Sequence, residues 1–319
     1  MTALRLSNRL RFGRGEWLAL GAAITYGVSN TLTRVGATQG DALAGSIVRL
    51  LPLVLMALGM MAWRPKHAVR LLAWRPEFVG WRDIGWLTFY SLVVTPLSQL
   101  SIFLALRFGG VLVAVSLFST FPLFGALIAI RFLGQAFNRR IGAGIVTCLL
   151  GITLLTLGQY SGRPFSPLWP VGAVCALLAG LTWGTSANLS GHLLRRGLDV
   201  YTLLVVTTVT AVVVLSLGLT AAGGVNVISA FRGTDLWTLL AAGLLNGLAQ
   251  AMLWSAFGLT TVASAGAIKT LDAVIASAIA VSLLGEVINV FVALGIAFIV
   301  GGVIVVQLAR RAEGRQSHP

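Results

Sequence analysis

Two charged residues stand close together in an otherwise apolar stretch late in the chain. Lys269 and Asp272 lie three residues apart within residues 260–284, so a helix would place them on one face. A charge at the centre of a membrane helix costs about 2.5–3.5 kcal/mol, so such residues are candidates for function. Lys269 could bind a carboxylate or phosphate, and Asp272 an amino group or a proton. The alternative is an internal ion pair that fixes helix packing.

Arg49 is a third charged residue in an apolar run. Apart from Asp41 at its start, the run of residues 41–63 carries no other charge. Arg49 could bind an anion, or it could donate to backbone carbonyls at a helix break. It lies about a third of the way into the run, so its long side chain could also extend to the membrane interface.

Amide side chains recur at helical spacing in two further apolar runs. Thr95 and Gln99 are four residues apart, and so are Asn246 and Gln250, with Trp254 another four residues on. Each set therefore lines one helical face, and we expect both faces to line a shared cavity. The alternative role is hydrogen bonding between helices, worth about 0.6 kcal/mol per bond on average in membranes.

Two aromatic residues occupy matching sites near the start of each half of the chain. Tyr26 and Trp183 each lie between a Thr and a Gly, with Asn30 and Asn188 about one helical turn further on. An apolar ring beside an amide suits a cavity for an amphipathic metabolite. The alternative is that the rings face lipid or the membrane interface.

These residues are positioned by a unit that occurs twice. Residues 97–152 align with residues 248–303 at one constant shift without a gap. The superposed pairs include Gln99 with Gln250, Ala105 with Ala256, Gly134 with Gly285, Asn138 with Asn289, Gly144 with Gly295 and Gly151 with Gly302. Residues 25–29 similarly match residues 182–186. The chain is therefore two copies of one unit, and duplicated membrane chains are most often small-molecule transporters.

Composition places both copies in a membrane. Hydrophobic residues make up 57% of the chain and charged residues 10%, with a mean hydropathy of +0.92. Soluble domains have about 25% charged residues. The net charge is +14, and the basic residues that produce it lie between the apolar runs. This placement indicates cytosolic loops and not a nucleic-acid partner.

Several enzyme and metal-site patterns are missing from the sequence. The three His residues are widely separated, the two Cys lie in apolar runs, and no phosphate-binding G-x-x-x-x-G-K-[ST] motif occurs. We therefore expect no metal, no cofactor and no enzymatic activity.

Apolar runs of about 20 residues predict an all-α polytopic membrane protein with ten transmembrane helices. We place these helices at about residues 16–35, 41–63, 84–107, 109–131, 140–158, 168–192, 199–222, 235–257, 260–284 and 287–308. With the N-terminus in the cytosol, 17 of the 23 Lys and Arg residues lie on the cytosolic side and four on the other. Both termini are therefore predicted to be cytosolic.

The odd number of helices in each copy makes the two copies inverted repeats, which in transporters enclose a substrate site near the midplane. The predicted organisation is a basic cytosolic N-terminus (1–15), a first five-helix repeat (16–158), a linker (159–167), a second five-helix repeat (168–308) and a basic cytosolic tail (309–319).

The chain resembles the drug/metabolite transporter superfamily, and within it the EamA-type ten-helix transporters, over nearly all of residues 16–308. The matching motifs are Arg49 early in the second helix, Ser119-Thr120-Phe121-Pro122 followed by Leu133-Gly134-Gln135, Gly144 and Gly151, and Leu284-Gly285-Glu286 followed by Gly295 and Gly302. Gln135 departs from the acidic residue of the family pattern. Asp272-Ala273 departs from the Pro that the family favours, where substrate specificity is expected to be set. The resemblance implies transport of amino acids, nucleotide sugars, organic cations or other metabolites.

The sequence thus predicts a secondary-active or facilitative transporter of a small polar metabolite that works by alternating access. Export of an amino acid is one candidate activity, proton coupling is one candidate mechanism, and a bacterial inner (plasma) membrane is the expected location. The charges of Arg49, Lys269 and Asp272 favour anionic or zwitterionic substrates over bare cations. A flippase for lipids or lipid-linked sugars is the alternative. An intramembrane enzyme is disfavoured, because acidic residues and His are too scattered.

Overall fold

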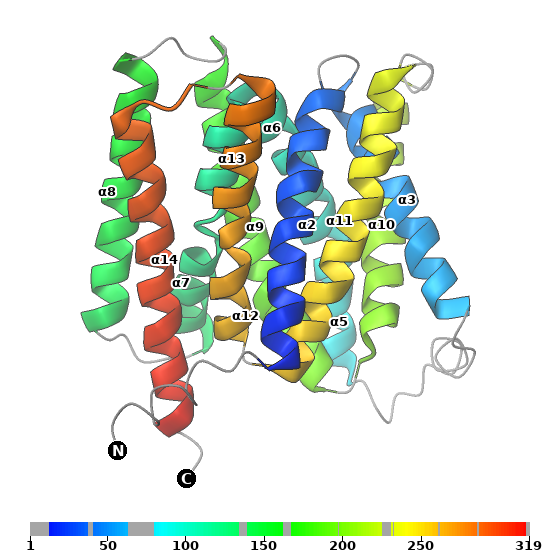
Figure 1. Cartoon of the computed structure of the whole chain (residues 1–319). Helices are drawn as coiled ribbons and strands as arrows, with labels where there is room; N and C mark the ends of the chain where they lie inside the picture. The colour runs from blue at the N-terminus through cyan, green and yellow to red at the C-terminus, as the bar shows by residue number, and fades with distance from the viewer. Residues whose placement is uncertain are drawn as a thin grey trace.

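The computed structural model describes residues 13–37, 41–62, 80–133, 139–161, 167–196, 198–224, 231, 233–260, 262–285 and 287–316. Within these ranges every regular element is a helix (Figure 1). The first half contains α2 (Arg14–Gly36), α3 (Ala42–Ala62), α5 (Trp81–Phe89), the π-helix η1 (Tyr90–Val94), α6 (Thr95–Phe118), α7 (Phe121–Leu133) and α8 (Arg139–Ser161). The second half contains α9 (Trp169–Arg195), α10 (Val200–Ala221), α11 (Thr234–Leu259), α12 (Val262–Lys269), α13 (Leu271–Leu284) and α14 (Val290–Gln316).

These elements form the ten predicted spans, so the prediction of an all-helical membrane fold with duplicated halves is confirmed. The third span consists of α5, η1 and the first part of α6. It ends at Gly110, whose φ of 71° and ψ of 176° interrupt the helix that α6 otherwise continues. A positive φ strains any residue with a side chain, so glycine suits this position. The fourth span then consists of the rest of α6 and α7, and the ninth of α12 and α13.

Two spans that the sequence predicts as continuous are broken near their centres. The fourth is interrupted at Ser119 and Thr120, and the ninth at Thr270. The spans predicted at residues 109–131 and 260–284 are therefore present, and each consists of two helical segments. In the first break, Pro122 has no N–H to donate to the preceding turn, and the Thr120 hydroxyl donates to a backbone carbonyl at 2.6 Å.

The two breaks are equivalent. The constant shift that superposes the repeats places Ser119 on Thr270, so the same helix is interrupted at the same level in each half. The second break has no proline. There, the Ala273 N–H donates to the Thr270 carbonyl at 3.2 Å, three residues back, which tightens the turn.

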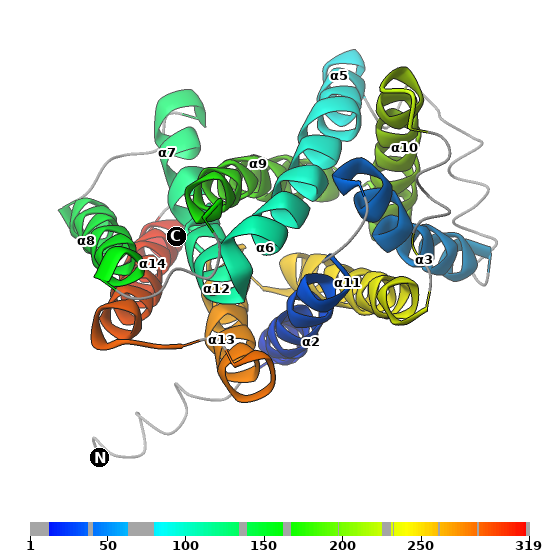
Figure 2. The same cartoon turned by 90° about the horizontal axis from the view of Figure 1, so that it is seen from above.

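The halves run through the molecule in opposite directions. In Figure 1, α2 begins and α14 ends on the lower side, as an inverted repeat of five-helix units requires. Seen from above, α8 and α14 form a pair at one end, and α3 and α10 lie at the other end (Figure 2). α14 continues to Gln316, so most of the predicted tail is helical. Predictions for residues 1–12, Gln135 and Glu286 lie outside the described residues.

Glycines bring the α8–α14 pair together. A Cβ added at Gly151 would lie 2.7 Å from the Ile299 nitrogen. At its repeat partner Gly302, a Cβ would lie 2.7 Å from the Gly144 carbonyl oxygen. Small residues at these two sites therefore let the equivalent helices of the two halves pack backbone to backbone.

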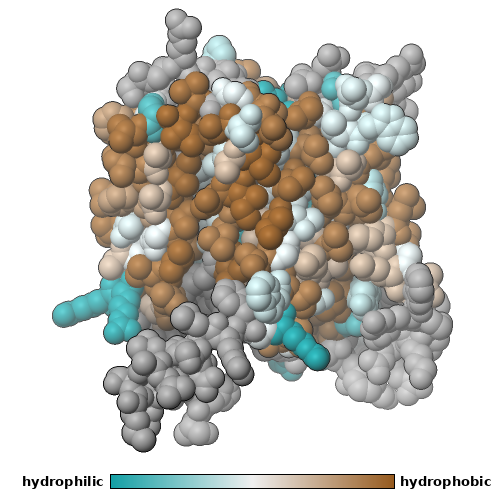
Figure 3. All heavy atoms as spheres, in the orientation of Figure 1, coloured by the Kyte–Doolittle hydropathy of each residue, from teal (hydrophilic) through white to brown (hydrophobic). Residues whose placement is uncertain are grey.

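The distribution of polarity is that of a membrane protein. An apolar band covers the face seen in Figure 3, with hydrophilic surface gathered at its edges. Leu55 and Leu217 are 69% and 64% exposed, whereas Lys269 and Asp272 are fully buried. Among the described residues, five helical stretches are long and apolar enough to cross a membrane, and one of them, Trp81–Phe118, joins α5, η1 and α6. The surface of the protein is apolar and its interior carries charge, so the helices are surrounded by lipid.

Candidate functional site

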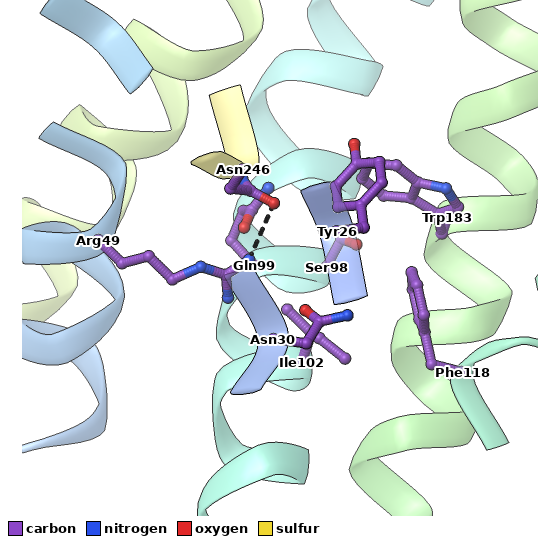
Figure 4. Close-up of a pocket in the computed structure, with 9 residues that line it drawn as sticks. All are labelled: Tyr26, Asn30, Arg49, Ser98, Gln99, Ile102, Phe118, Trp183 and Asn246. Atoms are coloured by element: carbon purple, nitrogen blue, oxygen red, sulfur yellow. Dashed lines mark hydrogen bonds between the residues drawn. The ribbon is translucent and has the colours of Figure 1, made fainter. Parts of the chain in front are cut away.

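A small cavity lies between helices of both halves. It is bounded by α2, α3 and α6 from the first half and by α9 and α11 from the second. Its lining residues are Tyr26, Asn30, Arg49, Ser98, Gln99, Ile102, Phe118, Trp183 and Asn246 (Figure 4). Its volume of about 20 Å³ gives room for about one water molecule.

The cavity lies deep in the membrane-spanning region. Tyr26, Trp183 and Asn246 each lie about halfway along their helices, and Arg49 lies about a third of the way along α3. The polar lining side chains are buried, with Arg49 and Asn246 only 3% exposed. Burial of polar groups at this depth is unfavourable unless they have a partner, so the cavity is a candidate binding site.

One end of the cavity carries charge and amides. The Arg49 Nη2 donates to Asn246 Oδ1 at 3.2 Å, linking α3 of the first half to α11 of the second. Within the part of the chain that the structure describes, Arg49 Nε and Nη1 and Asn246 Nδ2 have no hydrogen-bond partner. Figure 4 shows the guanidinium beside Asn246 and Gln99. This end therefore offers several unused N–H donors.

The other end is aromatic. The Tyr26 and Trp183 rings meet edge to face, with centroids 6.1 Å apart and planes at 89°. Phe118 contacts Trp183 in a similar way at 5.9 Å. In Figure 4 these three rings lie on the side away from Arg49. The symmetry-related residues Tyr26 and Trp183 are thus brought into direct contact.

Lys269 and Asp272 form an ion pair behind the aromatic end. Lys269 Nζ lies 2.8 Å from Asp272 Oδ2, and both side chains are fully buried. The ammonium also lies 4.3 Å from the Phe118 ring centroid, 4.8 Å from that of Phe121 and 5.2 Å from that of Tyr26. Neither charged residue lines the cavity.

The repeat explains this arrangement. The shift that aligns the halves places Phe118 on Lys269 and Phe121 on Asp272. Both pairs flank a helix break, so equivalent positions of the two broken spans meet at the centre of the molecule. The second half supplies the ion pair, and the first half supplies the three rings that the ammonium contacts.

The structure brings together six of the sequence-predicted site residues at the cavity: Tyr26, Asn30, Arg49, Gln99, Trp183 and Asn246. The others lie elsewhere. Asn188 donates to the Gly125 carbonyl at 3.0 Å and so joins α9 to α7. Gln250 is 1% exposed, and its Oε1 has no partner among the described residues. Trp254 packs in an apolar cluster with Tyr90 and Leu203. Thr95 donates to the Tyr90 carbonyl at 3.0 Å.

Three lining residues were not predicted: Ser98, Ile102 and Phe118. Ser98 and Ile102 flank Gln99 on one face of α6, at spacings that helical geometry would have supplied. Phe118 could have been found from its alignment with Lys269 in the repeat.

A second set of polar contacts joins the third span to α9. The Tyr90 hydroxyl lies 2.6 Å from Ser186 Oγ, and nearer the helix ends His192 Nε2 lies 3.0 Å from Asp83 Oδ1. Tyr90 begins the π-helix, a local irregularity that often marks functional positions. In the described ranges, no three His, Cys, Asp or Glu residues gather as a metal site.

The chain is similar to known proteins in sequence and in fold. A family model for EamA-like transporters matches residues 13–157 and again 170–308. A solved crystal structure, described only as that of a protein, superposes with a TM-score of 0.63 at 16% identity, covering 94% of this chain and 98% of the other. No curated protein matches. The two family matches cover both of the halves that form the cavity. The chain therefore belongs to the EamA-like transporter family.

Proposed function

We propose that this transporter carries a small polar metabolite by alternating access, as a secondary-active or facilitative carrier, with the cavity as its substrate site. One observation carries the proposal. The cavity lies between the inverted halves and presents buried Arg49 and Asn246 donors that have no partner among the described residues. A polar substrate would supply those partners. Rocking of one half against the other would expose the site to each side in turn.

The conformation described here is a closed one. At about 20 Å³ the cavity holds a water molecule but no metabolite, so substrate must widen it. The breaks at Ser119 and Thr270 supply points at which the fourth and ninth spans can bend. Because they are equivalent in the repeat, the two halves can exchange conformations during transport.

Finer features of the function rest on the sequence. Export of an amino acid is one candidate activity within this proposal, and proton coupling at Asp272 is one candidate mechanism. Cytosolic termini and a bacterial inner membrane are also part of the proposal. Units 16–158 and 168–308 are the proposed moving halves. A lipid or lipid-linked sugar flippase is the alternative. A flippase would need a groove open to lipid, whereas this cavity is lined by five helices that surround it.

Uptake by purified protein in liposomes tests the proposal. The panel contains radiolabelled amino acids, organic acids and phosphorylated metabolites, with empty liposomes as background. Saturable uptake of at least one compound, lost in Asn246→Ala but retained in the surface variant Trp237→Ala, would support the site assignment. Trp237 is 70% exposed on α11, the same helix that carries Asn246. Uptake that is unchanged in Asn246→Ala would remove the cavity from the mechanism.

A further inference from the structure

We propose that the cavity selects an organic monocarboxylate with a flat aromatic body over the corresponding zwitterion or cation, and that Arg49 binds its carboxylate. This inference rests on the proposed function, because it names the substrate class for the same cavity. It differs from the amino-acid assignment, which requires the site to hold an ammonium group as well.

The charge balance of the cavity is the first argument. Of the nine lining residues, Arg49 is the one that carries a charge, and none is acidic. Lys269 and Asp272 neutralise each other at 2.8 Å behind the aromatic wall. The cavity therefore has a net charge of about one positive unit, which a single carboxylate would balance.

The geometry of Arg49 is the second argument. Its side chain is 3% exposed, and only Nη2 has a hydrogen-bond partner among the described residues. Nε and Nη1 remain unused. The planar guanidinium offers parallel N–H groups that match the two oxygens of a carboxylate. The neighbouring Asn246 Nδ2 adds another unused donor.

The aromatic end disfavours a cationic group. Tyr26, Trp183 and Phe118 form a wall against which a flat ring can pack. The Lys269 ammonium already lies over the Phe118 and Tyr26 rings, at 4.3 and 5.2 Å from their centroids. Two of the three rings that could attract a substrate cation therefore already hold a cation of the protein, which leaves Trp183 as the ring without this contact among the described residues.

A zwitterion would be held less well than the anion. Its ammonium would lose its bound water and would have to contact the amide carbonyl oxygens of Asn30 or Gln99 instead. No lining residue carries a carboxylate that could pair with it. A buried ammonium without a carboxylate partner is strongly unfavourable. The anion that lacks this group avoids the cost.

Three compounds that share a phenylethyl group and differ in their charged groups test the proposal. They are 3-phenylpropionate (anion), phenylalanine (zwitterion) and phenethylamine (cation), measured by calorimetric binding in detergent and by uptake in liposomes. We expect 3-phenylpropionate to bind at least tenfold more tightly than phenylalanine, and phenethylamine not to bind. Arg49→Gln should weaken 3-phenylpropionate binding by about ten- to a hundredfold, and Arg49→Lys should weaken it less.

Arg107→Gln is the control, because it removes a positive charge from α6 outside the cavity and should leave binding unchanged. Equal or tighter binding of phenylalanine by the wild-type protein would overturn the proposal, and so would unchanged binding in a folded Arg49→Gln variant. Binding of none of the three would also overturn it. In that case, saturable uptake of another compound in the wider panel would still support a metabolite carrier.

Discussion

Replacing Lys269 by Met should reveal how much stability the buried ion pair controls. Both side chains are fully buried with the charged atoms 2.8 Å apart, so the substitution leaves the Asp272 carboxylate without its cation. Removing one member of a buried pair costs about 3–5 kcal/mol of unfolding free energy. Asp272→Asn should cost about 2 kcal/mol less, because the remaining ammonium keeps its contacts with three aromatic rings.

The double variant Lys269→Met/Asp272→Asn separates pairing from packing. With both charges absent no buried charge lacks a partner, and we expect stability within about 2 kcal/mol of wild type. The sum of the two single losses would be at least twice as large. The difference is the coupling energy of the pair.

The assay is chemical unfolding in detergent, followed with a thiol-reactive dye. Cys148 is fully buried, so it reacts only when α8 separates from its neighbours. Cys175 is partly exposed, so the measurement is made in a Cys175→Ser background. Additive losses in the double variant would refute the reasoning, because they would mean that the two charges do not compensate each other.

Three further substitutions test packing and polar contacts elsewhere. Gly302→Ala should destabilise the protein by about 1–3 kcal/mol, because its Cβ would approach backbone of α8, whereas Gly301→Ala meets nothing within 4 Å and should be neutral in the same unfolding assay. Tyr90→Phe removes an interhelical hydroxyl contact and should cost about 0.6–1.7 kcal/mol in that assay, and a larger loss would show that the contact couples to other groups. His192→Gln combined with Asp83→Asn in a double-mutant cycle should give a coupling energy of less than about 1 kcal/mol, since this side-chain contact is partly exposed.

Much of the fold could be predicted from the sequence, because lipid leaves the backbone few alternatives. In lipid, the backbone N–H and C=O groups of each apolar run must bond to one another, which a helix allows. The internal repeat then showed which helices of the two halves are equivalent. The breaks were harder to predict. Pro122 marks one of them, but Thr270 has no proline nearby to mark the other.

The sequence indicated which polar residues face the protein interior, but not which of them meet in one cavity. Polar residues in apolar helices must face the protein interior, and for that reason Arg49, Gln99 and Asn246 were found. Which of them meet depends on how each helix is rotated, and spacing along one helix cannot fix that rotation. Asn30 and Asn188 occupy similar places in the two halves, yet one lines the cavity and the other binds the backbone of α7.

In the proposed alternating-access cycle, the unequal residues at the two helix breaks would make the two open states unequal in free energy. If the inverted halves were chemically identical, the inward-open and outward-open states of the proposed cycle would be related by a two-fold rotation and equally populated. Phe118 and Phe121 in one half face Lys269 and Asp272 in the other, so this degeneracy is lifted. A difference of about 1.4 kcal/mol would already favour one state tenfold. In the proposed cycle the empty carrier would therefore have a preferred resting side, and the two charged residues contribute to that preference.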